Sequence, residues 1–368
     1  MADSIFGKLR GHVGEARGRA QEDKREREQA ERKADSVILT KREVQGEWDA
    51  ARTLYTTLGA TGPKSMRAIT ANDLAQYRHN MRMAQSNFKG NGITARQVID
   101  LASSKPLPPA LGAKNPETDI DRARRQINMA IPVSAVNNEV RFITNAGPDS
   151  DVNRHHVLVR FNAFSEAANK MLAAKSKDRS TPKQTANWLR KQKLAFDCDC
   201  KRHRFFFRYI STIGNFNAGR DELGYPKIRN PNLKGVACKH VLRVMSEIDT
   251  SATVLSFLTK HMEKVHASAN NTSKHQMRQA EADEAAQKQA ARRRTIKTSE
   301  QRAQDRARAQ ERNALNVAAK KVKRVKVKPV NTRKIESALK SGKLAESDLE
   351  VLRRFGFSDK QIADKLGV

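Results

Sequence analysis

The chain has 368 residues, with 71 Lys+Arg against 40 Asp+Glu and a formal net charge of +31 at pH 7. Hydrophobic residues make up 38% and aromatic residues 5%, so we expect solvated helices or basic segments beside any packed core. The sequence contains no run of 18 apolar residues and no apolar stretch near its amino terminus, which predicts neither a membrane span nor a secretion signal. Its three cysteines are too few for a disulfide scaffold.

Helices are predicted for the first hundred residues, taken as a region over 1–104. A long helix is expected over 14–58, because apolar residues recur every seven positions in its second half. Shorter helices are expected over 72–85 and over 94–103, the latter with Thr94 as its N-cap. Prolines then predict a linker over 105–118.

The central region, 119–269, contains both helix-like and strand-like patterns. A helix is expected over 119–130, and two β-branched runs, 139–144 and 156–161, predict a hairpin because turn-forming residues separate them. The remaining expected elements are helices over 165–177 and 181–196, a strand over 204–210, a loop over 214–235, and helices over 239–248 and 251–267.

Basic, low-complexity sequence fills 270–328. Residues 274–328 carry 17 Lys+Arg against 6 Asp+Glu, and apart from Ala the only aliphatic side chains between 270 and 313 are Met277 and Ile296. We expect no packed face there, only a solvated helix or a disordered arm. Residues 329–368 are amphipathic again and predict a small helical module. Its last segment, from Ser358, resembles the first helix and turn of a helix-turn-helix and begins with a Ser358-x-x-Gln361 capping box. Because no recognition helix follows that turn in the sequence, we expect a docking bundle rather than a groove-reading helix.

All three cysteines fall into one pattern, Cys198-x-Cys200, then 37 residues, then Cys238-x-His240. Two cysteines two residues apart at a strand end can aim both sulfurs at one point, and a Cys-x-His at a helix start can supply two more ligands. Three thiolates and one imidazole form a closed tetrahedral site that suits Zn²⁺ in a structural role. The alternatives are three buried free thiols, and His203 in place of His240.

With the apolar helix that follows it, this pattern resembles the SWIM zinc finger family over residues 194–248. The resemblance implies that Cys198, Cys200, Cys238 and His240 bind zinc, and that the module binds DNA or another protein. Its spacer is longer than in typical members, so 214–235 looks like an insertion. The sequence has no Walker motif, Gly-x-Ser-x-Gly or His-Glu-x-x-His, so we expect no enzyme.

Basic and aromatic residues interleave from Lys201 to Tyr209. On a strand, alternation would place arginines outward for phosphate contact and leave a ring for stacking, although a core strand with solvated charges fits equally well. His155 and His156 would point to opposite faces of a strand, so they are not expected to share a metal. The candidate nucleic-acid contacts, in the finger and the basic arm, are Lys201, Arg202, Arg204, Arg208, Arg292, Arg293, Arg294, Lys320, Lys321, Lys323 and Arg324.

Together these features predict an α+β fold: a mainly helical chain with a central small β-containing zinc-finger domain, long charged helices or arms, and a small helical C-terminal module. The expected function is a non-enzymatic zinc-binding protein that associates with nucleic acid, with DNA favoured. The alternative is a structural component of a multi-copy assembly such as a phage virion, in contact with other protein subunits. Neither a membrane span nor a small-molecule substrate is expected. The expected location is a bacterial host's cytoplasm or a virion if the chain is phage-derived, and otherwise the cytoplasm or nucleus.

Overall fold

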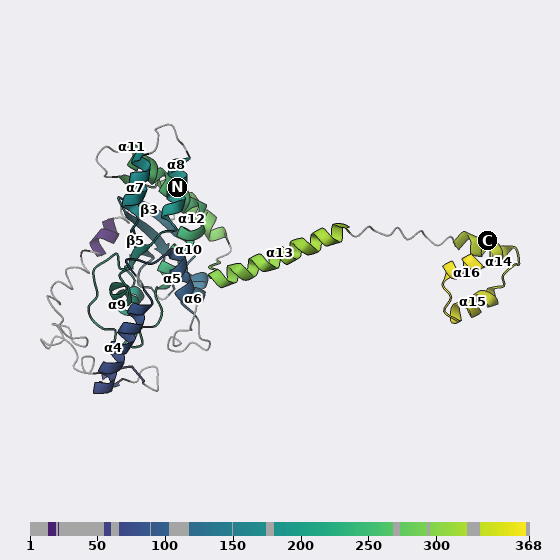
Figure 1. Ribbon diagram of the computed structural model, residues 1–368, viewed down its shortest axis with the longest axis horizontal. Coiled ribbons are helices and arrows are strands. Elements are labelled where there is room, and N and C mark those ends of the chain that lie inside the picture. The colour runs from purple at the N-terminus through teal and green to yellow at the C-terminus, as the bar shows by residue number, and fades with distance from the viewer. Residues whose placement is uncertain are drawn as a thin grey trace. The chain divides into compact units, whose positions relative to one another are not determined.

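A five-stranded antiparallel sheet forms the centre of the computed structural model of this chain (Figure 1). The structure describes residues 14–19, 21, 55–59, 66–88, 90–102, 118–148, 150–173, 180–267, 273–292, 295–321 and 332–365. It divides into two compact units, Met1–Ala303 and Gln304–Val368, and the sheet belongs to the first. The fold is therefore a mixed α+β fold, as predicted.

The strands of this sheet lie in the order β6-β5-β4-β3-β7. Their bounds are Ala130–Val136 (β3), Glu139–Asn145 (β4), Arg154–Phe161 (β5), Leu194–Cys198 (β6) and Lys274–Gln276 (β7). The predicted hairpin is confirmed, because β4 and β5 pair from Glu139↔Arg160 to Asn145↔Arg154. Strand β3 was not predicted. Its Pro132 argues against a strand, and the structure accommodates that proline at an irregularity in the β3–β4 register between Pro132 and Ser134.

Helix α10 (Lys239–Thr250) is the central helix of the first unit. Every residue from His240 to Ile248 is buried, because the helix packs across β3 to β6 and against α5 and α6. Two charged residues are buried within it, and Arg243 lies 3.1 Å from Glu247 one turn later. Burial of a whole helix surface is possible because neighbouring elements cover it on all sides.

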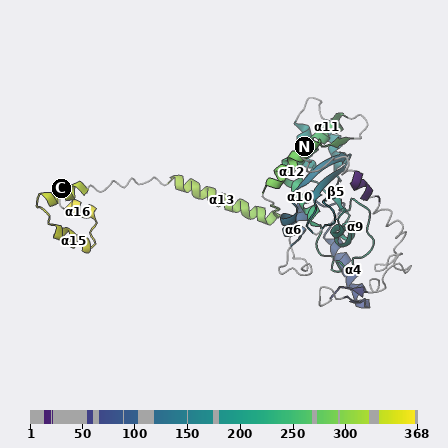
Figure 2. The ribbon, with the colours of Figure 1, turned by 180° about the vertical axis from the view of Figure 1, so that it is seen from behind.

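Other helices surround the sheet and α10. In both views α11 lies at one end of the unit and α4 at the opposite end (Figure 1 and Figure 2). Their bounds are Ala71–Ser86 (α4), Ala95–Ala102 (α5), Asp119–Gln126 (α6), Phe164–Ala173 (α7), Thr181–Leu189 (α8), Arg208–Ile213 (α9), Ala252–Ala267 (α11) and Gln279–Ala291 (α12). Helix α13 (Ser299–Lys321) begins in the first unit and continues into the second. A π-helix, η1 (His203–Phe207), precedes α9. None of the described helices has the length and apolar content that would let it cross a bilayer.

Several expected helices agree with the structure. Helices α4, α5, α10 and α11 begin and end within about two residues of their predicted limits. Thr94 and Gln97 form a capping box at the start of α5, in which the Gln97 N–H donates to Thr94 Oγ1 at 3.2 Å. Local capping and apolar spacing were sufficient to locate these helices.

Four expected elements differ from the structure. The helix predicted over 119–130 ends at Gln126, and Ala130 begins strand β3. The helix predicted over 14–58 is helical at 14–19, but Tyr55–Thr56 is strand β1, paired with β2 (Arg67–Ala68). The helix predicted over 181–196 ends at Leu189, since β6 begins at Leu194. The strand predicted over 204–210 is helical. The linker over 105–118 and the middle of 14–58 lie outside the described residues, apart from Thr118, the N-cap of α6.

The expectation that 274–328 has no packed face is wrong for its first part. Strand β7 pairs with β3, and Met277 and Ile296 are both buried. Helix α12 buries Ala282, Ala285 and Ala286, whose small side chains let its backbone approach β3 closely. Alanine therefore supplies the buried face that a search for larger aliphatic residues misses. In α13, by contrast, nearly all the described side chains are exposed.

The second unit contains three short helices, α14 (Thr332–Lys340), α15 (Glu346–Arg354) and α16 (Asp359–Lys365). Their small core contains the apolar residues predicted to pack there, Ile335, Leu344, Leu349 and Ile362. The Ser358 capping box also forms, with the Ser358 N–H donating to Gln361 Oε1 at 2.9 Å.

His275 on β7 predicts a pH dependence of stability. Its ring packs 4.6 Å from Phe257 and both ring nitrogens are buried without a partner among the described residues. Burial, with Lys264, His261 and Lys260 nearby, lowers the pKa of His275 to about 4 from 6.5. Between about pH 6.5 and pH 4, therefore, His275 is protonated in the unfolded chain but neutral in the folded chain. Stability should be constant above about pH 6.5 and fall by up to about 3 kcal/mol as the pH drops towards 4.

Urea unfolding of wild type and of His275→Phe at pH 7, 5.5 and 4.5 measures this contribution. The variant should lose less stability than wild type as the pH falls, because phenylalanine takes up no proton. His79→Phe, at an exposed position of α4, is the control and should follow wild type. Parallel losses in wild type and His275→Phe would contradict the interpretation.

Candidate metal centre

A buried group of three cysteines and one histidine lies where β6 ends and α10 begins. Cys198 is the last residue of β6, Cys238 is the N-cap of α10 and His240 is in the first turn of that helix. The potential ligand atoms of Cys198, Cys200, Cys238 and His240 all lie within 4.8 Å of one another. His240 Nδ1 is 4.0 Å from the sulfurs of Cys198 and Cys238. The structure thus brings together all four predicted ligands.

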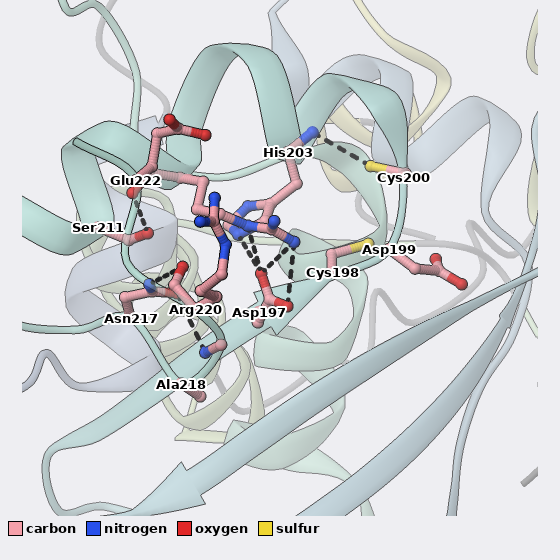
Figure 3. Close-up of polar contacts among 12 residues, drawn as sticks. Asp197, Cys198, Asp199, Cys200, His203, Ser211, Asn217, Ala218, Arg220 and Glu222 are labelled. Carbon is pink, nitrogen blue, oxygen red and sulfur yellow. Dashed lines mark hydrogen bonds and ion pairs between the residues drawn. The ribbon is translucent and has the colours of Figure 1, made fainter. Parts of the chain in front are cut away.

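Local backbone interactions fix both halves of this group. Pairing of Cys198 with Val157 of β5 holds the first half against the sheet. The backbone N–H of His203 donates to Cys200 Sγ at 3.3 Å (Figure 3). Before Cys238, Gly235 adopts a φ of 77°, and a Cβ there would lie 2.9 Å from the Phe207 ring. The chain therefore enters the second half through a turn that requires glycine.

The donor set fits a metal ion. Burial raises the pKa of Cys198 and of Cys200 well above the ordinary value. Burial also opposes ionisation of Cys238, but hydrogen bonds from the other two thiols and His240 lower its pKa well below that value. Burial lowers the pKa of His240 and keeps its imidazole neutral, the form that binds metals. Three buried sulfurs this close together cannot all ionise without a cation, so a metal ion is the natural counter-charge.

His203, the alternative ligand, points away from the three sulfurs. Its Nε2 lies 3.1 Å from Asp197 Oδ1, and the whole side chain is buried. Four protein ligands without His203 would complete a tetrahedron. In such a site a sulfur and a nitrogen bonded at about 2.3 Å and 2.0 Å lie about 3.5 Å apart, and His240 Nδ1 lies 4.0 Å from the sulfurs of Cys198 and Cys238.

Asp199, between Cys198 and Cys200, holds the two histidines of β5 that lie beside His240. Its Oδ1 lies 2.8 Å from His155 Nδ1 and accepts a hydrogen bond from the His156 N–H at 3.1 Å. The ring of His155 packs on that of His240, with centroids 4.3 Å apart. Neither His155 nor His156 belongs to the group of four potential ligands.

Asp197, on the other side of Cys198, binds a buried arginine. Arg208 Nε donates to Oδ1 at 3.0 Å and Nη2 donates to Oδ2 at 3.2 Å. Although burial raises it, the pKa of Asp197 stays below its usual range because Arg208 and His203 stabilise the carboxylate. Figure 3 shows Asp199 extending away from this group. Neither aspartate was predicted as part of the site, although the alternation Asp-Cys-Asp-Cys in the sequence places both of them next to the cysteines.

The predicted phosphate contacts near the metal centre differ in exposure. Arg208 is only 3% exposed and is fully engaged by Asp197, so a role in phosphate binding does not fit it. Arg202 Nε donates to the buried Asp119 at 3.0 Å. Lys201, in contrast, is exposed and pairs with an equally exposed Asp151 at 2.8 Å. Arg204 is half-buried.

The predicted contacts in the basic arm are only partly described. Arg292 is exposed where α12 ends. Lys320 and Lys321 belong to α13, but their side chains are outside the described part of the structure. Arg293, Arg294, Lys323 and Arg324 lie outside the described residues altogether.

Comparison of the chain with family models, with curated proteins and with solved structures gives no match. Function must therefore be inferred from the geometry of the metal centre and from the distribution of charge. The first feature is a buried group of potential metal ligands in the first unit. The second is an excess of exposed cations on and after α13.

Replacing a single ligand should abolish stoichiometric metal binding. Cys238→Ser and His240→Asn should each lower bound zinc from about one per chain to a small fraction. Each should also lower the unfolding free energy by at least about 3 kcal/mol, because metal binding and folding are coupled. Elemental analysis after dialysis and urea unfolding measure the two effects.

His203→Gln is the control for this experiment, because the glutamine amide reaches about as far as Nε2 of His203 and can donate to Asp197, but a ligand role would be lost. It should keep about one zinc per chain. Loss of zinc in His203→Gln together with its retention in His240→Asn would show that His203, and not His240, is the fourth ligand.

Arg208 should act on stability and not on nucleic-acid affinity. Arg208→Met removes both guanidinium hydrogen bonds to the half-buried Asp197 carboxylate, which should cost about 2 to 3 kcal/mol. The double variant Arg208→Met, Asp197→Asn removes the unpaired charge and should recover part of that loss. Lys201→Gln, which removes an exposed pair, should leave stability almost unchanged. A loss in Arg208→Met no larger than in Lys201→Gln would contradict this structural role.

Proposed function

We propose that this chain is a non-enzymatic zinc-binding protein that associates with nucleic acid, preferably DNA, mainly through phosphate contacts. The buried Cys198, Cys200, Cys238 and His240 group supports the metal part of the proposal. Zinc is the metal of choice because thiolates and imidazole are its preferred ligands and because it favours a tetrahedron. When bound, it would supply the positive charge that lets the three sulfurs ionise together.

A structural role for the metal follows from the ligand count. Catalytic zinc sites keep one position open for water or substrate, whereas four protein ligands leave none. The buried group also joins the end of β6 to the start of α10, although 39 residues of sequence lie between Cys198 and Cys238. We assign this module to the SWIM type on its Cys-x-Cys…Cys-x-His order, on the strand before the first pair and on the helix after the second.

The observation that carries the nucleic-acid part is the concentration of cations on and after α13. Residues 304–328 contain 9 Lys+Arg and 2 Asp+Glu. Within the described part of α13, Arg306, Arg308 and Arg312 are exposed, and the helix has almost no buried face of its own. Exposed arginines of this kind displace counterions from a phosphate backbone and bind without sequence preference.

Several arginines near the metal centre are neutralised by carboxylates. Arg202 pairs with the buried Asp119, Arg208 with the half-buried Asp197 and Arg243 with the buried Glu247, so their positive charge serves folding. Nucleic-acid affinity should therefore depend on the α13 segment more than on the metal centre.

Neutralising α13 should weaken duplex binding and flatten its salt dependence. Binding of random-sequence duplex DNA is measured between about 50 and 300 mM salt. The triple variant Arg306→Gln, Arg308→Gln, Arg312→Gln should reduce the slope of log Kd against log salt by about 2 to 3, because each lost phosphate contact removes about 0.9.

The matched control is Lys343→Gln, Arg354→Gln, Lys360→Gln, which removes three exposed charges from the helical module. It should leave the slope within about one unit of wild type. Equal slopes in the two triple variants would remove α13 as the phosphate-binding element. No binding by wild type even at about 50 mM salt would overturn the nucleic-acid function and assign the charge to an acidic protein partner.

A further inference from the structure

The π-helix η1 follows the metal ligand Cys200 within three residues and presents an aromatic ring to solvent. In η1 the backbone N–H of Arg208 bonds to the carbonyl of His203, five residues earlier, and π-helical turns occur frequently at functional sites. The three phenylalanines of this turn differ in exposure. Phe207 is buried and Phe206 is half-buried, but Phe205 is 46% exposed.

Cations accompany these rings. The guanidinium carbon of Arg204 lies 5.4 Å from the centre of the Phe205 ring, and that of Arg202 lies 4.6 Å from the centre of the Phe206 ring. Lys201, one turn before Phe205, is 77% exposed, and its pair with Asp151 is a surface ion pair of little strength. We call Lys201, Arg204 and Phe205 the Phe205 platform.

Surrounding contacts hold the backbone of this platform in place. On one side the His203 N–H bonds to Cys200 Sγ, and on the other Asn230 Nδ2 donates to the carbonyl of Phe206 at 3.0 Å. Arg208, at the end of the turn, is fixed by Asp197. The ring is therefore exposed on a rigid support attached to the metal centre, so little conformational entropy remains to be lost on binding.

An exposed ring beside cations has the chemistry to bind an unpaired base and its phosphate. A base offers a flat π-face for stacking on Phe205, and its phosphate offers negative charge to Lys201 and Arg204. In a duplex the base faces are stacked on one another and cannot reach such a ring. We infer that the Phe205 platform binds single-stranded nucleic acid, an inference that rests on the proposed function and names its preferred substrate. The α13 arginines would bind either form through phosphates alone.

Truncating Phe205 should weaken single-strand binding selectively. Fluorescence anisotropy measures the Kd of a labelled oligo-dT of about 15 nucleotides and of a random duplex. Phe205→Ala should weaken oligo-dT binding about 5- to 100-fold, because loss of one stacked base costs about 1 to 3 kcal/mol. Duplex binding should change by less than about twofold, and the salt slope should stay the same, since no phosphate contact is lost.

Two further variants make the result specific. Phe205→Trp keeps a stacking surface, so it should retain oligo-dT affinity, and the fluorescence of the new indole, taken as the difference from wild type, should be quenched on binding. Phe355→Ala is the matched control, because Phe355 in the second unit is 77% exposed and should not matter. Retained zinc content and melting temperature in each variant verify that the fold is intact.

The outcomes separate this inference from the proposed function. If Phe205→Ala leaves both oligo-dT binding and salt-sensitive duplex binding unchanged, the Phe205 platform does not bind single strands. The proposed phosphate-binding function would then still hold. Equal weakening in Phe205→Ala and Phe355→Ala would also overturn the inference about the Phe205 platform. Failure of wild type to bind either nucleic acid at about 50 mM salt would overturn both proposals. Self-association that Phe205→Ala abolishes, without any effect on oligo-dT, would assign the ring to a protein contact instead.

Discussion

The structure depends on the burial of three thiols and one imidazole at a single point between the sheet and its central helix. Cys198 fixes the end of β6, and Cys238 and His240 fix the start of α10, so the group determines where α10 crosses the sheet. Because α10 is buried along almost its whole length, the elements around it must adapt to that position. In the proposed function, a cation shared by the four side chains would make this arrangement favourable, since burial alone opposes ionised sulfur.

The two aspartates that alternate with the first cysteines extend this constraint outward. Asp199 connects it to His155, whose ring covers His240, and Asp197 connects it to Arg208. A basic residue near the metal centre is therefore not automatically a nucleic-acid contact, because buried carboxylates already neutralise several of these arginines. Arg208 and Arg243 are buried, and the half-buried Arg202 pairs with Asp119. Lys201, Arg306, Arg308 and Arg312 are exposed and Arg204 is half-buried, and these five residues carry the proposed affinity for phosphates.

Local signals in the sequence predicted much of the fold and the members of the metal-ligand group. Capping boxes located α5 and α16, alternating β-branched residues located the β4–β5 hairpin, and ligand spacing identified the four side chains that the structure gathers. The errors occurred where a distant contact overrides local preference. Three consecutive phenylalanines favour a strand, yet residues 203–213 are helical, in a geometry where Arg208 reaches Asp197. Strand β3 was missed because Pro132 disfavours a strand, and the register irregularity that accommodates it is apparent only in the folded sheet. Helix α12 was missed because its buried face consists of alanines, which give little apolar signal in the sequence.

X-ray absorption at the zinc edge tests the central claim of this account most directly. The protein is expressed with zinc, dialysed and measured without any substitution that could perturb its fold. The account predicts one zinc per chain, with three sulfur neighbours at about 2.3 Å and one nitrogen neighbour at about 2.0 Å. A first shell of oxygen and nitrogen alone, or a folded chain that retains no metal, would contradict the claim that a shared cation holds β6 and α10 together.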